Sequence, residues 1–97
     1  MGENEIAEIG TVAVSLAGRD KGRYFVIVEV LDEGYVTVVD GSLRKVDSAK
    51  KKKLKHLKLK PVTIPTIKER LLKGEKLFDF EIRSHLEALG YDGRDKG

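Results

Sequence analysis

The chain has 97 residues, 40% hydrophobic and 36% charged, which is enough for one domain with a modest core and a heavily charged surface. It contains no cysteine, which excludes disulfides, thiolate catalysis and cysteine-based zinc sites. No apolar run approaches the roughly 20 residues that span a bilayer, and residues 1–5 are acidic, unlike a secretory signal. These features predict a cytoplasmic protein.

Five short strand patterns follow an acidic segment, residues 1–8, that we expect to be flexible. The first three are an alternating pattern over 12–16, a β-branched and aromatic run over 24–31, and a shorter run over 35–39. Asp40-Gly41 predicts a type I′ hairpin turn. The return strand would cover 42–46, and a last, edge-like strand 54–59. Tight turns with no helix between these strands predict a mainly β fold, a small antiparallel barrel over residues 9–60.

The periodicity changes over residues 61–90, which we predict to be a proline-bounded linker with one or two short α-helices. The two prolines lack the N–H group that a strand ladder needs, so we expect the sheet to stop at Pro61. Thr66 and Glu69 have the spacing of a capping box and predict the start of a short helix. Gly74 predicts the end of that helix.

A second helix is predicted to start at an Asp79 cap. Its apolar residues Ile82, Leu86 and Leu89 form one stripe, and Gly90 predicts its end. The stripe can cover the open end of the barrel, or it can dock a protein partner. Residues 91–97 are polar and glycine-rich, and we expect them to be disordered.

Positive charge is concentrated in residues 44–60, which hold nine Lys and Arg residues against a single acid, Asp47. This segment carries +8, whereas the whole chain carries only +3, so the remainder is net acidic. A one-sided positive field is typical of a polyanion binder, for which phosphates are the usual partner. The segment is rich in Lys and lacks the amide side chains that read DNA bases, which favours structured RNA. No apolar anchor lies beside this segment, so the sequence does not indicate binding to a membrane surface.

The basic run also has a second interpretation, because blocks of like charge are often solvated and disordered. Residues 50–53 are the low-complexity part, and we interpret them as a flexible arm that becomes ordered on RNA. Leucines alternate with lysines over residues 54–60, which predicts that the second half is attached to the barrel.

A glycine-bounded turn over residues 18–22 is the second candidate site. It places Arg19 and Lys21 where backbone donors and two cations can meet a phosphate. The alternative is that Gly18 and Gly22 only allow a sharp turn, with the charges in water.

The same region resembles a KOW motif, the RNA-binding signature of several ribosomal proteins and transcription elongation factors. The matching residues are Val12-Ala13-Val14, Gly18, Lys21-Gly22, Val26, Val28 and Val30. Residues 10–59 resemble most closely the KOW family of the fourteenth large-subunit ribosomal protein of archaea and eukaryotes, with its bacterial relatives. Residues 26–32, residues 38–41 and a basic run ending in His56-Leu57 carry this likeness.

One position departs from the KOW pattern. Phe25 stands where many KOW motifs place a second glycine, which suits the ribosomal branch better than the elongation factors. The resemblance implies an SH3-like barrel that binds RNA, with Arg19, Lys21 and Gly22 matching the contact loop of the family.

Enzymatic chemistry finds no support in the sequence. His56 and His85 lie on different elements outside any nucleophile or metal motif, and the Ser84 side chain points away from its neighbour His85 on a helix. We therefore expect no enzyme, no catalytic residue, no metal, no cofactor and no small-molecule substrate.

The sequence thus predicts a ribosome-associated RNA-binding protein of KOW type, with ribosomal RNA as its partner and ribosomal proteins as further partners. The predicted RNA-binding residues are Arg19, Lys21, Gly22, Arg23, Arg44, Lys45, Lys50, Lys51, Lys52, Lys53, Lys55, His56 and Lys58. The alternative is a protein-interaction barrel that docks on RNA polymerase or a ribosome-assembly factor through the helix stripe.

Overall fold

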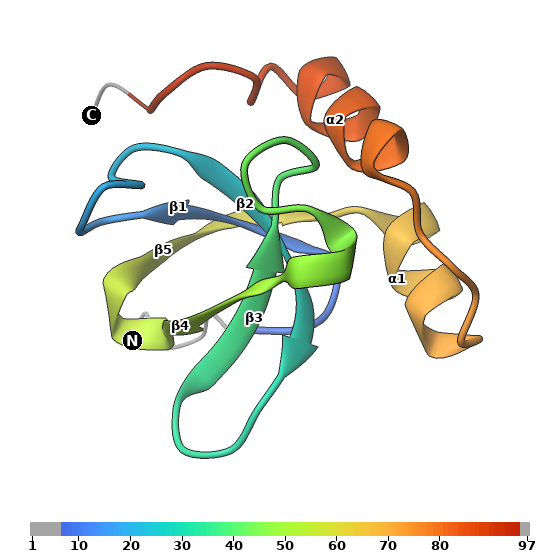
Figure 1. Cartoon of the computed structure of the whole chain (residues 1–97), viewed down its shortest axis with the longest axis horizontal. Helices are drawn as coiled ribbons and strands as arrows, with labels where there is room; N and C mark the ends of the chain where they lie inside the picture. The colour runs from blue at the N-terminus through green and yellow to red at the C-terminus, as the bar shows by residue number, and fades with distance from the viewer. Residues whose placement is uncertain (1–6, 96–97) are drawn as a thin grey trace.

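The computed structural model describes residues 7–95 and shows, within them, one five-stranded antiparallel sheet and two short α-helices (Figure 1). The elements are β1 (Thr11–Ser15), β2 (Tyr24–Val30), β3 (Tyr35–Val39), the 3-10 turn η1 (Val46–Ser48), β4 (Lys50–Lys53), the 3-10 turn η2 (Leu54–His56), β5 (Leu57–Thr63), α1 (Pro65–Leu72) and α2 (Asp79–Ala88). The strand order is β4-β3-β2-β1-β5. The mainly β fold and the C-terminal helices are confirmed. The predictions for residues 1–6 and 96–97 lie outside the described residues.

The sheet is strongly curled. Strands β4 and β1 are separated by two others, which would place them about 14 Å apart in a flat sheet. The Lys52 Nζ on β4 nevertheless lies 3.1 Å from the Ser15 Oγ on β1. The curl encloses an inner cluster of buried residues, namely Ala13, Phe25, Ile27, Val36, Val38 and Leu57. Over residues 7–95 no strand pairing joins β4 to β5, so the sheet curls without closing through a ladder.

The two helices cover the opposite face of the sheet, as Figure 1 shows. The core cluster between the sheet and the helices consists of Val12, Val26, Val39, Ile64, Ile67, Leu77, Ile82 and Leu86. Because successive strand residues point to opposite faces, covering both faces buries every residue of β1. The predicted stripe on α2 is therefore part of the core at Ile82 and Leu86, while Leu89 remains 41% exposed.

Glycines end both helices, as the sequence predicts. Gly90 has φ +81° and donates to the Glu87 carbonyl, while the Tyr91 N–H donates to the Leu86 carbonyl. This is the Schellman arrangement, which satisfies the last carbonyls of a helix. Gly74 ends α1 in the same way. In the described part of the chain, neither helix is long and apolar enough to cross a membrane.

The predicted starts of both helices are wrong in detail. Helix α1 begins at Pro65, because the fixed φ of proline suits the first helical position, and Thr66 is not the cap. Asp79 lies inside α2 and accepts a hydrogen bond from the Val46 N–H at 2.8 Å. The Glu81 carboxylate instead accepts the Phe78 N–H at the start of α2.

The predicted return strand over residues 42–46 is a loop. The Asp40 carboxylate accepts hydrogen bonds from the N–H groups of Ser42 and Arg44, which fixes a turn that competes with strand pairing. Gly41 has positive φ but Asp40 does not, so the type I′ prediction also fails. Two successive left-handed residues occur instead at Glu33 and Gly34.

The fourth strand is formed by residues 50–53, the segment interpreted as a flexible arm. It pairs with β3 in a regular register from Tyr35 to Val38. The last strand, β5, continues through Pro61 to Thr63, beyond the predicted stop. The register between β1 and β5 shifts over this stretch, and such an irregularity accommodates a residue without an N–H group.

Residues 91–95, predicted to be part of a disordered tail, instead contact the folded domain. The Tyr91 ring stacks on the Tyr24 ring with centroids 4.5 Å apart. Arg94 forms an isolated β-bridge with Arg23, and the Asp95 N–H donates to the Gly22 carbonyl at 2.7 Å.

Candidate nucleic-acid interface

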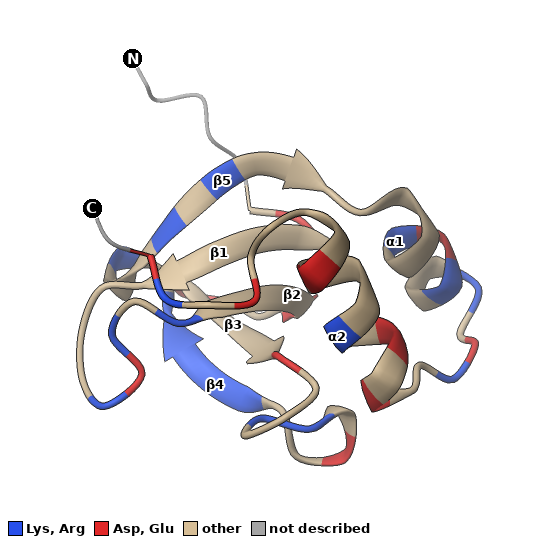
Figure 2. Cartoon of the chain, turned by 90° about the horizontal axis from the view of Figure 1, so that it is seen from above, with Lys and Arg blue, Asp and Glu red and all other residues tan. Residues whose placement is uncertain are grey.

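Positive charge gathers on β4, the η2 turn and β5. Residues 50–60 contain seven lysines and no acid. Figure 2 shows β4 as a continuous basic strand, with further basic positions on β5, whereas acidic positions recur along α2. The basic residues are therefore concentrated on the last two strands.

Strand register determines which lysines of β4 face solvent. Lys51 pairs with Thr37 and Lys53 with Tyr35, on the outer face of the sheet. Both lysines are exposed, and the Lys51 Nζ lies 4.6 Å from the centroid of the Tyr35 ring. Within residues 7–95 neither ammonium group is paired with a carboxylate, so both can meet a phosphate.

Lys52 points the other way, because it pairs with the buried Val36. Its side chain is only 11% exposed, and its Nζ lies 3.1 Å from the Ser15 Oγ and 3.6 Å from the Asp20 carboxylate. Lys52 therefore neutralises a buried acid. It was predicted as an RNA contact, but its Nζ faces the interior.

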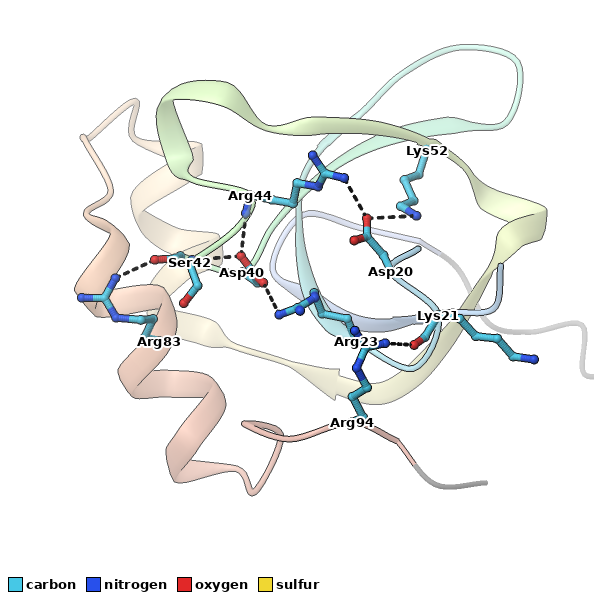
Figure 3. Close-up of polar contacts among 10 residues, drawn as sticks. Asp20, Lys21, Arg23, Asp40, Ser42, Arg44, Lys52, Arg83 and Arg94 are labelled. Atoms are coloured by element: carbon cyan, nitrogen blue, oxygen red, sulfur yellow. Dashed lines mark hydrogen bonds and ion pairs between the residues drawn. The ribbon is translucent and has the colours of Figure 1, made fainter. Parts of the chain in front are cut away.

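Asp20 is the centre of this inner ion network (Figure 3). Its buried carboxylate also accepts a hydrogen bond from the Arg44 Nη2 at 3.1 Å. Burial alone raises the pKa of Asp20, but the hydrogen bond and charge of Arg44, together with Lys52, outweigh burial and lower that pKa below its ordinary value. The carboxylate is therefore ionised in the folded protein at neutral pH.

A second buried acid holds Arg23. The Asp40 carboxylate lies 3.2 Å from the Arg23 Nη1 and accepts the two backbone N–H groups of its own loop. Arg23, Arg44 and Lys52, which we call the inner cations, are thus paired with carboxylates. All three belong to the predicted RNA-binding set, and the structure places their charges in the fold.

The loop over residues 18–22 uses its backbone donors internally. The N–H groups of Lys21, Gly22 and Arg23 donate to carbonyls of Gly18, Ser15 and Asp20, respectively. These three N–H groups, at the end of the loop, are therefore not available to a phosphate. The side chains of Arg19 and Lys21 remain exposed, and they are what this loop offers to a ligand.

Six exposed lysines lie on the loop, on β4, on η2 and on β5. We call this set the lysine rim, which consists of Lys21, Lys50, Lys51, Lys53, Lys55 and Lys58. Lys21 and Lys58 line one groove together with Leu16, Gly22 and Asp95. The His56 carbonyl accepts the Leu16 N–H at 2.8 Å, which attaches η2 to β1 beside this groove. Arg19, Lys45 and His56 are exposed as well.

Several residues at the site escaped the sequence analysis. Lys60 lies 6.0 Å from the ring centroids of both Tyr24 and Tyr91. The Tyr24 hydroxyl donates to the Asp95 carboxylate at 3.1 Å, and burial, followed by this hydrogen bond, raises the pKa of Tyr24. The polar composition of residues 91–97 gave no signal for these contacts. In the sequence Asp20 lies between Arg19 and Lys21, so the local pattern does not indicate that it is buried.

Comparison with known proteins shows partial similarity to a ribosomal protein. No protein-family model matches the chain. Over 38 residues the chain is 47% identical to the large ribosomal subunit protein eL14 of Methanococcus vannielii. The match covers 39% of this chain and 48% of that protein, so the chain spans about half the length of this relative. Part of the chain is thus related in sequence to a ribosomal protein.

Proposed function

We propose that this protein binds structured RNA, with ribosomal RNA as its target, as a cytoplasmic, ribosome-associated protein of KOW type. The observation that carries the proposal is the lysine rim, in which exposed ammonium groups occupy a segment, residues 50–60, that contains no acid. Binding would neutralise phosphates and release counterions. The partial similarity to a ribosomal protein supports the choice of RNA as the polyanion. No chemical step and no cofactor belong to this function.

The rim favours recognition of RNA shape over recognition of bases. Lysine supplies a point charge, which gives phosphate affinity with little selection among bases. The aromatic residues nearby are already engaged, since Tyr24 stacks on Tyr91 and Phe25 is fully buried. A stacking platform for single strands is therefore a poor fit, whereas the backbone of a folded RNA is a good one.

The scaffold supports the same proposal. The curled sheet with an inner apolar cluster suits an SH3-like barrel of KOW type, in which strand pairing fixes the lysines of β4. Charges on a paired strand lose less freedom on binding than charges on a flexible arm. The rim is thus suited to a rigid partner, such as the backbone of a folded RNA.

A double substitution at the rim tests the proposal. Lys55→Gln/Lys58→Gln removes two exposed charges, and Lys73→Gln/Lys76→Gln removes two exposed charges near the end of α1 as a matched control. Binding to fragments of ribosomal RNA is measured by fluorescence anisotropy between 50 and 300 mM salt, concentrations of the order over which about 10³-fold losses occur for multi-phosphate contacts. We expect the rim variant to bind more weakly and with a salt slope smaller by about 1 to 2.

Equal losses in both variants would show that the effect comes from net charge alone, and unchanged binding in the rim variant would contradict the proposal.

The alternative function, a protein-interaction barrel, depends on the α2 stripe as its docking surface. Two of its three residues, Ile82 and Leu86, are buried against the sheet, so that surface is occupied by the fold itself.

A further inference from the structure

Residues 91–95, which we call the strap, lie across the loop that the proposed function assigns to RNA. The strap forms a β-bridge between Arg94 and Arg23, and its Asp95 N–H donates to the Gly22 carbonyl. The Arg94 guanidinium donates to the Lys21 carbonyl, a contact that Figure 3 shows. Three successive residues of the loop, 21–23, are thus held by the strap.

The strap also brings negative charge to the lysine rim. Asp95 lines the same groove as Lys21 and Lys58. Its carboxylate accepts the Tyr24 hydroxyl, and the Tyr91 ring stacks on the Tyr24 ring. Asp95 therefore places a carboxylate on the wall of the groove in which a phosphate that contacts both lysines would lie.

We propose that the strap is an autoinhibitory segment that competes with RNA for the 18–22 loop and the adjoining groove. This inference rests on the proposed function, since it assigns a regulator to the same site. A phosphate that contacts both Lys21 and Lys58 would lie in the groove that Asp95 also lines, so its negative charge opposes the Asp95 carboxylate and favours the open strap. The apparent affinity then equals the intrinsic affinity multiplied by the fraction of molecules in which the strap is open.

Beyond Tyr91 the anchors of the strap are polar, which suits a segment whose end opens. Tyr91 packs against the core cluster, stacks on Tyr24 and has its ring centroid 6.0 Å from the Lys60 Nζ, whereas residues 92–95 are held by the short bridge, the Arg94 bond and the Tyr24 hydroxyl bond. Asp92 and Arg94 are exposed. Segments with few buried apolar contacts open at a small free-energy cost compared with the core.

Arg94→Ala distinguishes release of the strap from a simple effect of charge. The substitution removes a cation, so an electrostatic effect alone weakens RNA binding. If the strap competes with RNA, losing its bond to the Lys21 carbonyl opens the groove and tightens binding, by about two- to tenfold for one hydrogen bond. Lys73→Ala, which removes an exposed cation elsewhere, is the matched control and should give no tightening.

Tyr24→Phe is the second variant, because it deletes the hydroxyl bond to Asp95 without changing the charge. We expect it to tighten RNA binding in the same direction as Arg94→Ala. A direct measurement follows the Asp95 N–H by hydrogen exchange, since this group is bonded to the Gly22 carbonyl in the free protein. Its protection should disappear when the protein is saturated with the ribosomal RNA fragment.

The outcomes separate the two proposals. If the parent binds RNA with the expected salt dependence but neither strap variant binds more tightly, or the Asp95 amide stays protected in the complex, the strap is a fixed part of the fold. If only the strap variants bind RNA, autoinhibition is supported in its strongest form. If neither parent nor variants bind, the RNA function fails and the inference with it.

Discussion

Lys51 and Lys52 are neighbours in the sequence, yet they belong to two different regions of the molecule. Lys51 is exposed on the outer face of β4, whereas the Lys52 ammonium is enclosed with Asp20 and Ser15. The cause is the two-residue period of a strand, which sends successive side chains to opposite faces. A run of four lysines therefore supplies both an ion-pair partner for a buried carboxylate and charges on the surface.

The formal charge of a segment is therefore larger than the charge that its exposed side chains present to a ligand. Residues 44–60 carry +8, but Arg44 and Lys52 are paired with the buried Asp20, which lies outside that segment. The inner cations stabilise the fold, and the lysine rim remains for a ligand. Stability and RNA binding should therefore respond to different substitutions.

The largest expected effect comes from Asp20→Asn. This substitution leaves the Arg44 and Lys52 charges close together without a counter-charge, in a region where both are largely shielded from solvent. Removing one partner of a buried ion pair is strongly destabilising, and we expect a loss of about 2–4 kcal/mol in the free energy of unfolding. Urea denaturation followed by circular dichroism measures it.

Asp47→Asn is the matched control, because Asp47 is an exposed acid on η1. Its stability should change by no more than about 0.5 kcal/mol. If both variants unfolded at the same urea concentration, the inner ion network would have no role in stability.

Acidification should reproduce part of this loss. The folded-state pKa of Asp20 is lowered, so its contribution to stability is fully present above the pKa of the unfolded chain and is lost as the pH falls through the folded-state pKa. The parent should therefore lose more stability than Asp20→Asn between neutral pH and the acidic range below the ordinary pKa of a carboxyl. Parallel curves for the two proteins, from thermal unfolding at a series of pH values, would contradict this assignment.

The sequence predicted β1, β2 and β3 well because their signals are local. Alternation, β-branched residues and glycine turns decide these strands without help from distant parts of the chain. Gly74 and Gly90 likewise set the ends of both helices. The alternation of leucine and lysine over residues 54–60 is local as well, whereas pairing with β3 decides which lysines of β4 face solvent.

The sequence predictions failed where a contact with a residue far away in the chain determines the local structure. Asp40 signalled a hairpin, but its carboxylate fixes a loop and holds Arg23, 17 residues away. Residues 50–53 look disordered as a lysine run, and pairing with β3 makes them a strand. The strap depends on Tyr24 and Gly22, more than 60 residues earlier in the chain. No periodicity within a segment reports such contacts.

The smallest stability effect is expected from Lys51→Thr/Lys53→Thr on the outer face of β4. Threonine suits a strand, and neither lysine is paired with a carboxylate in the described residues, so the free energy of unfolding should change by no more than about 0.5 kcal/mol. RNA binding should weaken, with a smaller salt slope. The contrast with Asp20→Asn, which loses stability, then separates the two regions experimentally.

The same variant tests a second role for these lysines. Strand β4 lies at one end of the strand order, and lysines on such a strand discourage pairing with another molecule. If edge protection were their whole purpose, Lys51→Thr/Lys53→Thr would self-associate in light scattering and its monomer would keep the RNA affinity of the parent. We expect instead that the monomer itself binds RNA more weakly, because the proposed function assigns the lost charges to phosphate contacts.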